Sequence, residues 1–349
     1  MPNHTLRLPA EWESQSAILI AWPHTGTDWA ERLDAVEHSY VTLVGAITRF
    51  QPVLICVADD DLQTYAEARL RSARVEMGRV RFVTVEYDDT WLRDTGPITL
   101  VAQHNQNPAA QFVLLDFRFT GWGGKFEAQR DDRLVKALQA QGVFAAARHE
   151  PIDFALEGGA IDSDGAGSVL TTWQCLHQRH PQITRTQLTV KLKHWLRQDR
   201  VLWLEHGGLQ GDDTDAHIDT LARFAATDAI VYQACDDHSD HHHAALSAMA
   251  DEIAALRTVE DTPYRLFPLP WPRPIFYENR RLAASYANFL IINGAVLMPA
   301  YDDPADSAAA QVLADAFPDR EIVPIPCRPL IWQNGSLHCI TMQLPAGLV

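Results

Sequence analysis

The sequence has no hydrophobic run long enough to cross a membrane. A membrane-spanning helix needs about 18 or more consecutive apolar residues, and the most apolar segment, residues 287–300, is interrupted by Asn288 and Asn293. The first ten residues contain two prolines and no apolar core, so they do not resemble a secretory signal. We therefore expect a cytoplasmic protein with no membrane partner.

Cysteine is scarce and poorly placed for a structural role. The five cysteines are odd in number, lie far apart and form no Cys-x-x-Cys pair. This pattern argues against a disulfide framework and against a thiolate zinc site, and it favours a reducing compartment.

Glycine-rich phosphate loops are also missing. No G-x-G-x-x-G, no G-x-x-x-x-G-K-[ST] and no G-x-S-x-G motif occurs, which argues against a bound nucleotide and against a serine hydrolase. The glycine-rich patch Gly121–Gly124 lacks the strand and helix that would flank a phosphate site. We expect a turn there.

Positive charge is in deficit. The chain has 29 Lys and Arg against 45 Asp and Glu, which gives a formal net charge of −16. A surface of this sign repels phosphate backbones, so we expect no nucleic-acid partner. An acidic surface would also concentrate a small cationic ligand. The alternative, that the acidic residues only keep the protein soluble, stays open.

One histidine-rich run, His238–His243, stands at the start of a predicted helix. Its imidazoles and neighbouring carboxylates are possible metal ligands. A polar, solvated helix start explains the same residues, and we expect no metal in the protein.

Short apolar runs alternate with helical patterns, which predicts an α/β fold with strands covered on both faces. Strands are expected at 17–21, 53–57, 112–117, 168–172, 201–204, 230–232, 288–292 and 294–298. Helices are expected at 28–50, with Asp28 and Glu31 as a capping-box-like start, and near 131, 181, 239 and 304. This spacing hints at repeated strand–strand–helix units. The proline-rich stretch 263–274 predicts an irregular loop, and no linker divides the chain.

Four segments combine ionisable residues with Gly or Pro beside a predicted strand. They are Trp91–Pro97, Leu156–Gly159, Gly211–Asp219 and Gly335–Thr341. Loops at strand ends are where rigid α/β scaffolds carry function. These four segments are therefore the candidates for a functional site.

The four segments supply one thiol, Cys339, one imidazole, His217, and several carboxylates. A cysteine nucleophile needs a base or a cation to favour its thiolate, and a histidine also moves protons near neutral pH. Carboxylates around a thiol oppose ionisation until a cation arrives, and a planar guanidinium matches carboxylates through paired hydrogen bonds. The combination points to a cysteine that attacks a guanidinium carbon. A buried structural thiol, an Asp94–Arg93 ion pair and a turn carboxylate at Glu157 are the alternatives.

Together with further motifs, the four segments resemble a known family. The motifs are Leu8–Glu13, Ala21–Pro23, Trp91–Pro97, Leu156–Gly159, Asp213–Asp219, Ser285–Phe289, Asp302–Asp306 and Leu337–Gln343. In this order they resemble the agmatine deiminase family of the guanidino-group-modifying pentein superfamily. The resemblance implies one catalytic domain over residues 1–349. It also implies a five-bladed α/β propeller, with pseudo-fivefold ββαβ-type repeats around a central active-site channel.

The resemblance also implies roles for five catalytic residues. Cys339 would be the nucleophile and His217 the general acid and base. Asp94 and Asp219 would hold guanidinium nitrogens, and Glu157 would lie close enough to the substrate or to His217 to assist.

Four further residues are expected at the substrate site. Trp91 would form a wall over the guanidinium or the alkyl chain. Asp213 and Asp215 would be either rim charges for a distal ammonium or structural loop carboxylates, and Asn288 would order a strand end. The segment Gln333–Ser336 departs from the family, which commonly has a run of glycines there.

The reaction implied by the resemblance is hydrolysis of agmatine to N-carbamoylputrescine and ammonia, a step in putrescine biosynthesis. It would proceed through an amidino-cysteine intermediate without metal or organic cofactor, and a homo-oligomer is possible. One alternative is a deiminase of peptidyl-arginine or arginine. The other is a non-enzymatic protein that binds polyamines or metal.

Overall fold

Strands and helices recur in one order along the chain. This is seen in a computed structural model that describes residues 6–102, 111–145 and 147–349. Within those ranges, five sheets of three or four strands form, together with a two-stranded hairpin. In each of the five sheets, one strand pairs antiparallel with a second, and the second pairs parallel with a third.

The first sheet joins both ends of the chain, and the other four follow in sequence order. The first contains β2 (Gln15–Ala21), β3 (Val53–Val57), β4 (Val80–Thr84) and β19 (Met342–Pro345), and the second contains β1 (Leu6–Arg7), β5 (Ile98–Ala102), β6 (Phe112–Arg118) and β7 (Ala147–Ala155). The third has β8 (Ile161–Ser163), β9 (Ser168–Thr172) and β10 (Arg200–Leu204), and the fourth has β11 (Ala222–Ala226), β12 (Ala229–Gln233) and β13 (Arg265–Leu269). The fifth has β16 (Leu290–Ile292), β17 (Ala295–Ala300) and β18 (Glu321–Pro326), and the hairpin is β14 (Phe276–Tyr277) with β15 (Arg280–Arg281).

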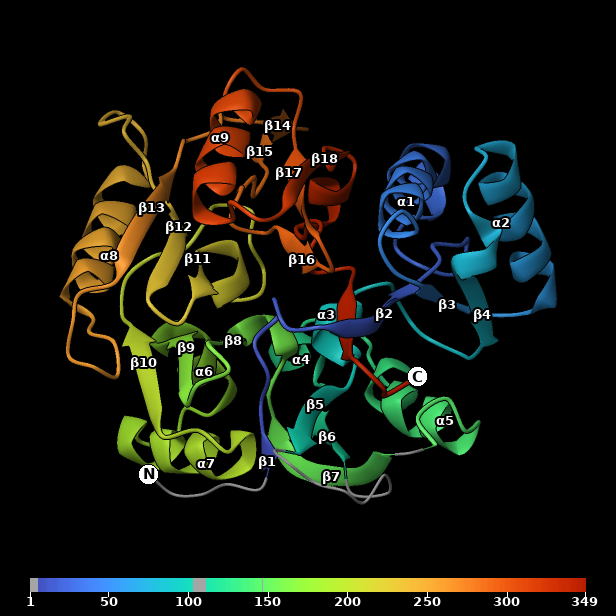
Figure 1. Ribbon diagram of the computed structural model, residues 1–349. Coiled ribbons are helices and arrows are strands. Elements are labelled where there is room, and N and C mark those ends of the chain that lie inside the picture. The colour runs from blue at the N-terminus through green and yellow to red at the C-terminus, as the bar shows by residue number, and fades with distance from the viewer. Residues whose placement is uncertain (1–5, 103–110, 146) are drawn as a thin grey trace.

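Helices connect the parallel strands and lie towards the outside of the molecule, where α2, α5, α7, α8 and α9 are seen in Figure 1. The α-helices are α1 (Leu33–Ile47), α2 (Asp60–Ser72), α3 (Leu92–Thr95), α4 (Gly121–Gly124), α5 (Leu134–Ala140), α6 (Trp173–Arg179), α7 (Arg185–Leu196), α8 (His243–Ala255) and α9 (Asp306–Ala316). Short 3₁₀ turns are η1 (Ala30–Arg32), η2 (Met77–Arg79), η4 (Asp131–Arg133), η5 (Gly158–Ala160), η6 (Ile218–Thr220) and η7 (Leu330–Gln333). None of the helices described here combines the length and apolarity that a membrane crossing requires.

The mixed α/β fold and all eight expected strands are confirmed, but the first predicted helix is wrong at its start. The chain forms η1 after Trp29, and α1 begins only at Leu33, with Arg32 as an N-cap that makes no side-chain bond. The cause is Trp29, which is fully buried and donates from its indole N–H to Thr90. Holding this ring in the core displaces the chain from a regular helix over residues 28–32.

The proline-rich stretch is also more regular than expected. Residues 265–269 form β13, which pairs parallel with β12. Because β13 is the edge strand of its sheet, Pro268 can occupy it at the side where a missing N–H breaks no ladder bond. Only the remainder of the stretch is an irregular loop.

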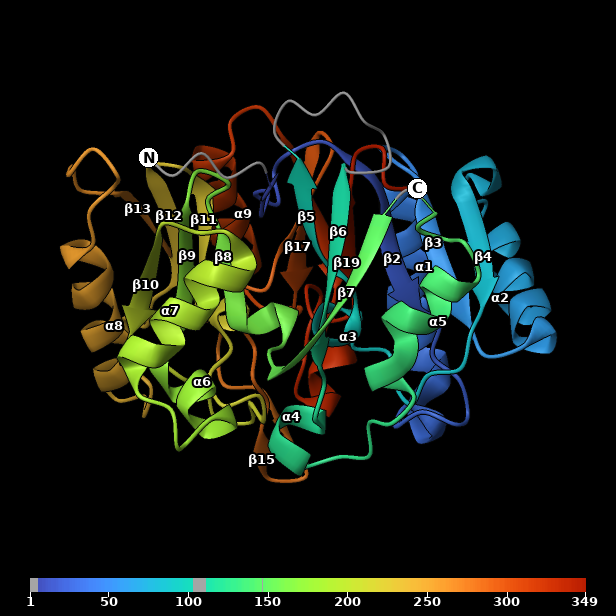
Figure 2. The same ribbon diagram turned by 90° about the horizontal axis from the view of Figure 1, so that it is seen from below.

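The candidate site residues lie on loops that occupy equivalent positions in the five sheets. In each of the five sheets, a loop with ionisable or polar residues comes shortly before the strand that starts the antiparallel pair. These loops are residues 91–95, 157–160, 217–220, 285–289 and 337–341. Figure 2 shows α4 and β15 at one end of the molecule, beyond the strand ends.

Candidate active site

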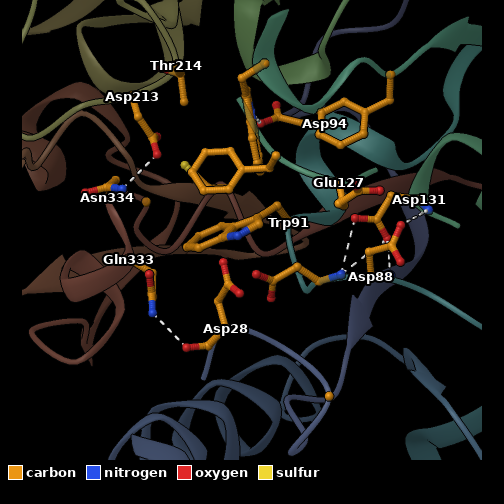
Figure 3. A pocket seen from close by; sticks show the side chains of 17 residues that line it. Asp28, Asp88, Trp91, Asp94, Glu127, Asp131, Asp213, Thr214, Gln333 and Asn334 are labelled. Carbon is orange, nitrogen blue, oxygen red and sulfur yellow. Dashed lines mark hydrogen bonds between the residues drawn. The ribbon is translucent and has the colours of Figure 1, made fainter. Parts of the chain in front are cut away.

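A cavity of about 320 Å³ is lined by Trp91 and Asp94 from the loop before β5, by Cys339 from the loop before β19, and by residues of neighbouring segments. Seven carboxylates line it, and of the described residues no lysine, arginine or histidine does. The carboxylates are Asp28, Asp88, Asp89, Asp94, Glu127, Asp131 and Asp213. In Figure 3, Trp91 lies across the middle of the view, with Asp94 and Asp213 on one side and Asp28 on the other. The cavity therefore suits a small cation with apolar parts.

Cys339 lines the inner part of this cavity in a turn just before β19, and it is 4% exposed. Asn288 holds the turn from two sides: its amide nitrogen donates to Sγ over 3.3 Å, and its oxygen accepts from the His338 backbone N–H over 2.9 Å. Burial, followed by the nearby carboxylates of Asp219 and Asp94, raises the pKa of the thiol well above its ordinary value. The free protein therefore holds Cys339 as a neutral thiol.

His217 stands between two carboxylates behind the cavity wall and is fully buried. Its Nδ1 is 3.6 Å from Asp94 Oδ1, and its Nε2 is 3.6 Å from Glu157 Oε2. Burial alone lowers the pKa of His217, but its neighbours, led by Asp94, raise it well above its ordinary value. The ring is therefore placed to donate a proton at neutral pH.

The loop before His217 is shaped by its own side chains. Asp212 accepts from the backbone N–H groups of Thr214 and Ala216, and the Thr214 hydroxyl accepts from the His217 N–H. Asp215 and Ala216 have φ angles of 66° and 68°, a conformation that the Asp212 bonds stabilise. The acidic character of this loop thus serves its own folding as well as the site.

Asp94 is held at both oxygens. The Gly159 backbone N–H donates to Oδ1 over 3.0 Å, and the Trp122 indole donates to Oδ2 over 2.8 Å. Burial raises the pKa of Asp94 to about 6, although His217 and the Trp122 bond oppose the rise. Trp122 itself lies in α4, where its φ is 55° between Gly121 at 62° and Gly123 at 84°. The predicted glycine-rich turn therefore exists, and it aims an indole at a catalytic candidate, a role that sequence reasoning missed.

Gly159 also explains why two glycines follow Glu157. A Cβ at Gly159 would lie 2.6 Å from His217 Nδ1 and 2.8 Å from Asp94 Oδ1, closer than real Cβ contacts allow. The two side chains approach each other across a position that only glycine can fill. This observation brings the loops before β5, β8 and β11 into one site.

Glu157 and Asp215 share a buried cation that the sequence did not reveal. Arg179 Nε donates to Glu157 Oε1 over 2.7 Å, and its Nη1 donates to Asp215 Oδ2 over 2.6 Å. Lys125 Nζ lies 2.7 Å from the same Asp215 oxygen. Asp215 therefore fits the structural alternative of the two predicted for it, while Asp213 lines the cavity and accepts from Asn334 over 2.7 Å.

Trp91 is 6% exposed and packs its ring on Trp29, with the centroids 5.5 Å apart. A Cβ at Gly335 would lie 2.2 Å from the Trp91 ring. The segment Gln333–Ser336, which departs from the family's glycine run, therefore keeps a glycine at the position where the wall of the cavity requires one.

Asp219 and His338 form a second layer beneath the thiol. Asp219 Oδ2 is 3.7 Å from Cys339 Sγ and 2.8 Å from His338 Nδ1. Burial raises the pKa of Asp219, but the hydrogen bond and charge of His338 outweigh it, so this pKa is lowered. His338 was not predicted, although its place directly before Cys339 was a signal.

Three side chains near the site have the composition of a metal site. Ligand atoms of Glu157, Cys175 and His217 all lie within 4.8 Å of one another, and all three residues are buried. Nothing in the sequence placed Cys175 beside His217.

The histidine-rich run is a solvated helix start only in part: His238 and His241 are exposed, whereas the side chains of Asp240 and His242 are buried. Asp240 accepts from His242, from Trp271 and twice from Arg281, and its side chain is 2% exposed. His242 also accepts from the Gln210 backbone N–H over 2.8 Å, so its two ring nitrogens are already occupied. The run fixes the start of α8 to Arg281 of β15, to Trp271 after β13 and to Gln210 in the loop after β10.

Several buried polar atoms behind the cavity wall have no hydrogen-bond partner. They are Glu157 Oε2, Asp219 Oδ1 and both ring nitrogens of His217. Buried polar atoms are normally paired, so this cluster is a candidate place for a bound molecule that supplies the partners. Two of the three side chains are carboxylates, which require donors.

A match to a family model identifies the family of this chain. The model of the Porphyromonas-type peptidyl-arginine deiminase family covers residues 7–345. The chain belongs to this family. The expected resemblance to agmatine deiminases is confirmed as well, because the agmatine deiminase of Pseudomonas putida KT2440 is 33% identical over 97% of this chain and 95% of its own length.

Solved structures of family members have the same fold. An agmatine deiminase of Campylobacter jejuni, with one cysteine replaced by serine and substrate bound, is 34% identical and has a TM-score of 0.89, covering 100% of this chain and 99% of its own. A Porphyromonas gingivalis protein, provisionally assigned as an arginine deiminase, is 42% identical and has a TM-score of 0.88, covering 98% and 99%.

Proposed function

We propose that this deiminase-family member hydrolyses agmatine to N-carbamoylputrescine and ammonia, as a step in putrescine biosynthesis. The observation that carries this proposal is a buried thiol at the inner end of a cavity lined by seven carboxylates and, among the described residues, by no cationic side chain. Agmatine carries a guanidinium at one end and an ammonium at the other. Relatives named agmatine deiminase match nearly the whole chain.

The proposed position of the guanidinium follows from the unpartnered oxygens of Glu157 and Asp219 and from the nearby Asp94 carboxylate. Its N–H groups donate to the carboxylates of Asp94, Asp219 and Glu157, and its carbon faces Cys339 Sγ. The flat cation lies against Trp91, which adds a cation–π or apolar contact. This pose satisfies buried acceptors that otherwise lack partners.

The reaction proceeds in two halves. The Cys339 thiol gives its proton to water in the cavity and forms an S–C bond with the guanidinium carbon. The tetrahedral adduct then expels one nitrogen as ammonia, which takes a proton from His217. Water next adds to the amidino-thioether with His217 as the base, and breaking of the S–C bond releases the ureido product and restores the thiol.

Electrostatics makes the first step dependent on the substrate. The carboxylates and the burial that raise the thiol pKa disfavour a thiolate in the empty site. A bound guanidinium offsets the charge of Asp94 and Asp219, so it lowers the cost of forming the thiolate beside it. The nucleophile is therefore activated only when a cation is present.

The cavity also selects the class of guanidine. Free arginine would bring a carboxylate to a wall of carboxylates, and Arg179 and Lys125 are already paired with Glu157 and Asp215. Asp213, which lines the cavity, is the predicted partner of the distal ammonium. We assign Asp215 the structural role instead, because its carboxylate is paired with Arg179 and Lys125.

The proposal extends to the architecture. The five sheets, each with the same strand order and each contributing one loop to the site, correspond to the blades of a propeller in a single catalytic domain of residues 1–349. We propose a cytoplasmic enzyme that needs no cofactor and that can form a homo-oligomer, which size-exclusion chromatography with light scattering tests.

A substrate panel tests the proposed function. Agmatine, free arginine and an arginyl peptide are each incubated with the protein, and ammonia release is measured together with the mass of the ureido product. Agmatine alone should give rapid turnover. Faster turnover of the arginyl peptide would mean that the substrate is a peptidyl-arginine, while the type of reaction stays as proposed. If none of the three compounds is turned over and the protein contains stoichiometric metal, a non-enzymatic binding protein is favoured.

A further inference from the structure

His338 has a carboxylate at each ring nitrogen. Nδ1 is 2.8 Å from Asp219 Oδ2, and Nε2 is 2.7 Å from Glu11 Oε2. Because an ionised carboxylate only accepts hydrogen bonds, this geometry suits a ring that donates from both nitrogens. The side chain is 2% exposed, which keeps water from competing for either bond.

Glu11 is tied in turn to the core of the molecule. Its Oε2 accepts from Arg223 Nη2 over 2.8 Å, its Oε1 accepts from the Ile291 backbone N–H over 2.7 Å, and Arg93 Nη2 is 3.6 Å away. Burial raises the pKa of Glu11, but Arg223, His338 and Arg93 outweigh it and leave the pKa well below its ordinary value. Glu11 is therefore a fixed anion at the centre of three cations.

The position of Asp219 follows from this arrangement. One of its oxygens is held by His338, while the other, Oδ1, is buried without a partner. A carboxylate anchored at one oxygen presents the second in a defined direction. Asp219 is fully buried, and the guanidinium supplies the donor that Oδ1 lacks.

We propose that Glu11 and His338 are positioning residues that fix the orientation and charge of Asp219 for the guanidinium, although neither touches the substrate. The relay runs from Glu11, near the start of the chain, through His338 to Asp219. It rests on the proposed function, because it assigns Asp219 to guanidinium binding.

A purely structural role for His338 predicts a different behaviour. A structural defect lowers the fraction of folded enzyme, which reduces kcat per total protein and leaves KM and the pH profile unchanged. A loss of positioning weakens the contact that Asp219 makes in the bound state, which raises KM. It also removes the cation that keeps the Asp219 pKa low.

The test compares His338→Gln and Glu11→Gln with Glu13→Gln as the matched control. Glu13 is two residues from Glu11 but binds Arg7 in a partly exposed ion pair. We expect His338→Gln and Glu11→Gln to lower kcat/KM for agmatine by about 10- to 100-fold, the range seen when groups that orient an active-site ligand are removed. KM should rise more than kcat falls, and Glu13→Gln should change neither.

The pH profile separates positioning from structure. The charged and titratable groups that face Asp219 are His338, His217, Arg223, Arg93, Asp94 and Cys339. Without His338, Asp219 takes up its proton at higher pH, so the acid limb of kcat/KM should move to higher pH in His338→Gln. An unchanged acid limb together with an unchanged KM would overturn the proposal, whatever the loss in kcat.

Glu11→Gln leaves Arg223 with less counter-charge, so its folding is checked by thermal unfolding. Nitrogen-15 NMR of the substrate-free wild type supplies a measurement that needs no turnover. Both ring nitrogens of His338, assigned by their loss in His338→Gln, should have the shifts of N–H groups near neutral pH. One unprotonated nitrogen would overturn the relay. If no guanidine is turned over while both N–H signals are present, the proposed function fails and the relay geometry stands.

Discussion

At the residue scale, the candidate site consists of buried side chains that lack hydrogen-bond partners or lie close to groups that disfavour their ionised form. Cys339 is a thiol among carboxylates, and His217 is a ring with two free nitrogens. Such groups cost folding free energy unless a ligand completes them. Their coexistence in a cavity is therefore stronger support for function than any one of them alone.

Replacing Cys339 by serine should abolish turnover and keep binding. A hydroxyl lacks the nucleophilicity of a thiol, so we expect kcat for agmatine to fall by about 10⁴-fold or more. Calorimetry should still show agmatine binding, because Asp94, Asp219 and Glu157 remain. Ammonia release at the wild-type rate would contradict the covalent route, and Cys235→Ser, a control remote from the cavity, should behave as wild type.

The raised thiol pKa predicts a dependence of alkylation on pH and ligand. In the substrate-free protein, the thiolate fraction of Cys339 at neutral pH is smaller than that of an ordinary cysteine, and it increases as pH rises. Alkylation by iodoacetamide, followed by mass spectrometry, should therefore be slow near neutral pH and faster in alkali. Fast alkylation at neutral pH without any guanidinium would show that the site holds a thiolate already.

Replacing Gly159 by alanine tests the close approach of His217 and Asp94. A Cβ at 2.6 Å from His217 Nδ1 forces the ring or the carboxylate to move. Because a misplacement of about 1 Å costs about 100-fold in rate, kcat/KM should fall by at least that amount. Gly45→Ala, at a position in α1 without a positive φ where the added Cβ would meet only Val75 at 3.8 Å, serves as the control for a glycine replacement, with thermal unfolding measured for both.

At the scale of elements, the short loops before the five antiparallel pairs carry the proposed site residues, and helices lie outside the sheets. Each loop brings polar side chains towards the same region because equivalent strand ends meet there. The turn at α4 adds a second kind of support, since consecutive residues with positive φ direct Trp122 at Asp94.

Replacing Trp122 by phenylalanine should shift the acid limb of kcat/KM to higher pH. The indole hydrogen bond opposes the burial that raises the Asp94 pKa to about 6. Its loss raises that pKa further, so Asp94 becomes protonated at a higher pH and releases the guanidinium. We expect about a tenfold loss of kcat/KM near neutral pH, equivalent to about 1.4 kcal/mol.

The control for this variant is Trp271→Phe, which removes an indole bond to Asp240 away from the cavity. Its pH profile should match that of the wild type. A profile of Trp122→Phe that also matches the wild type would mean that Asp94 does not depend on the indole.

At the scale of the whole molecule, the sequence has an excess of acidic residues, and the charged side chains that line the cavity are all carboxylates among the residues that the structure describes. The net charge of −16 and the seven lining carboxylates attract a dication over distances longer than any contact. The same field opposes a substrate with a free carboxylate.

This field predicts a dependence on salt. Between ionic strengths of about 0.01 M and about 0.15 M, the Debye length falls from about 30 Å to about 8 Å, so kcat/KM for agmatine should fall several-fold. Turnover at saturation should change little, because the bound contacts are not screened. Methylguanidine, a monocation, should show a smaller decrease, and equal salt dependence for both would contradict steering by the cavity.

The sequence by itself determined the kinds of residues and their local frames. Each of the eight apolar runs that predicted a strand overlaps a strand of the structure. The motifs around Asp94, Glu157, His217, Asp219 and Cys339 identified five side chains that the structure brings together. These are local properties, because apolar spacing and turn residues fix the backbone conformation within a few positions.

Only the tertiary structure decided which polar and charged side chains are partners of one another. It assigned Asp215 to Arg179 and Lys125 and left Asp213 in the cavity. It also placed Trp122 on Asp94 and His338 between Glu11 and Asp219. Partners in these pairs lie 28 to 327 residues apart in the chain, and a carboxylate has the same local sequence whether it faces solvent, an arginine or a thiol. Packing of the five sheets, rather than spacing, sets those distances.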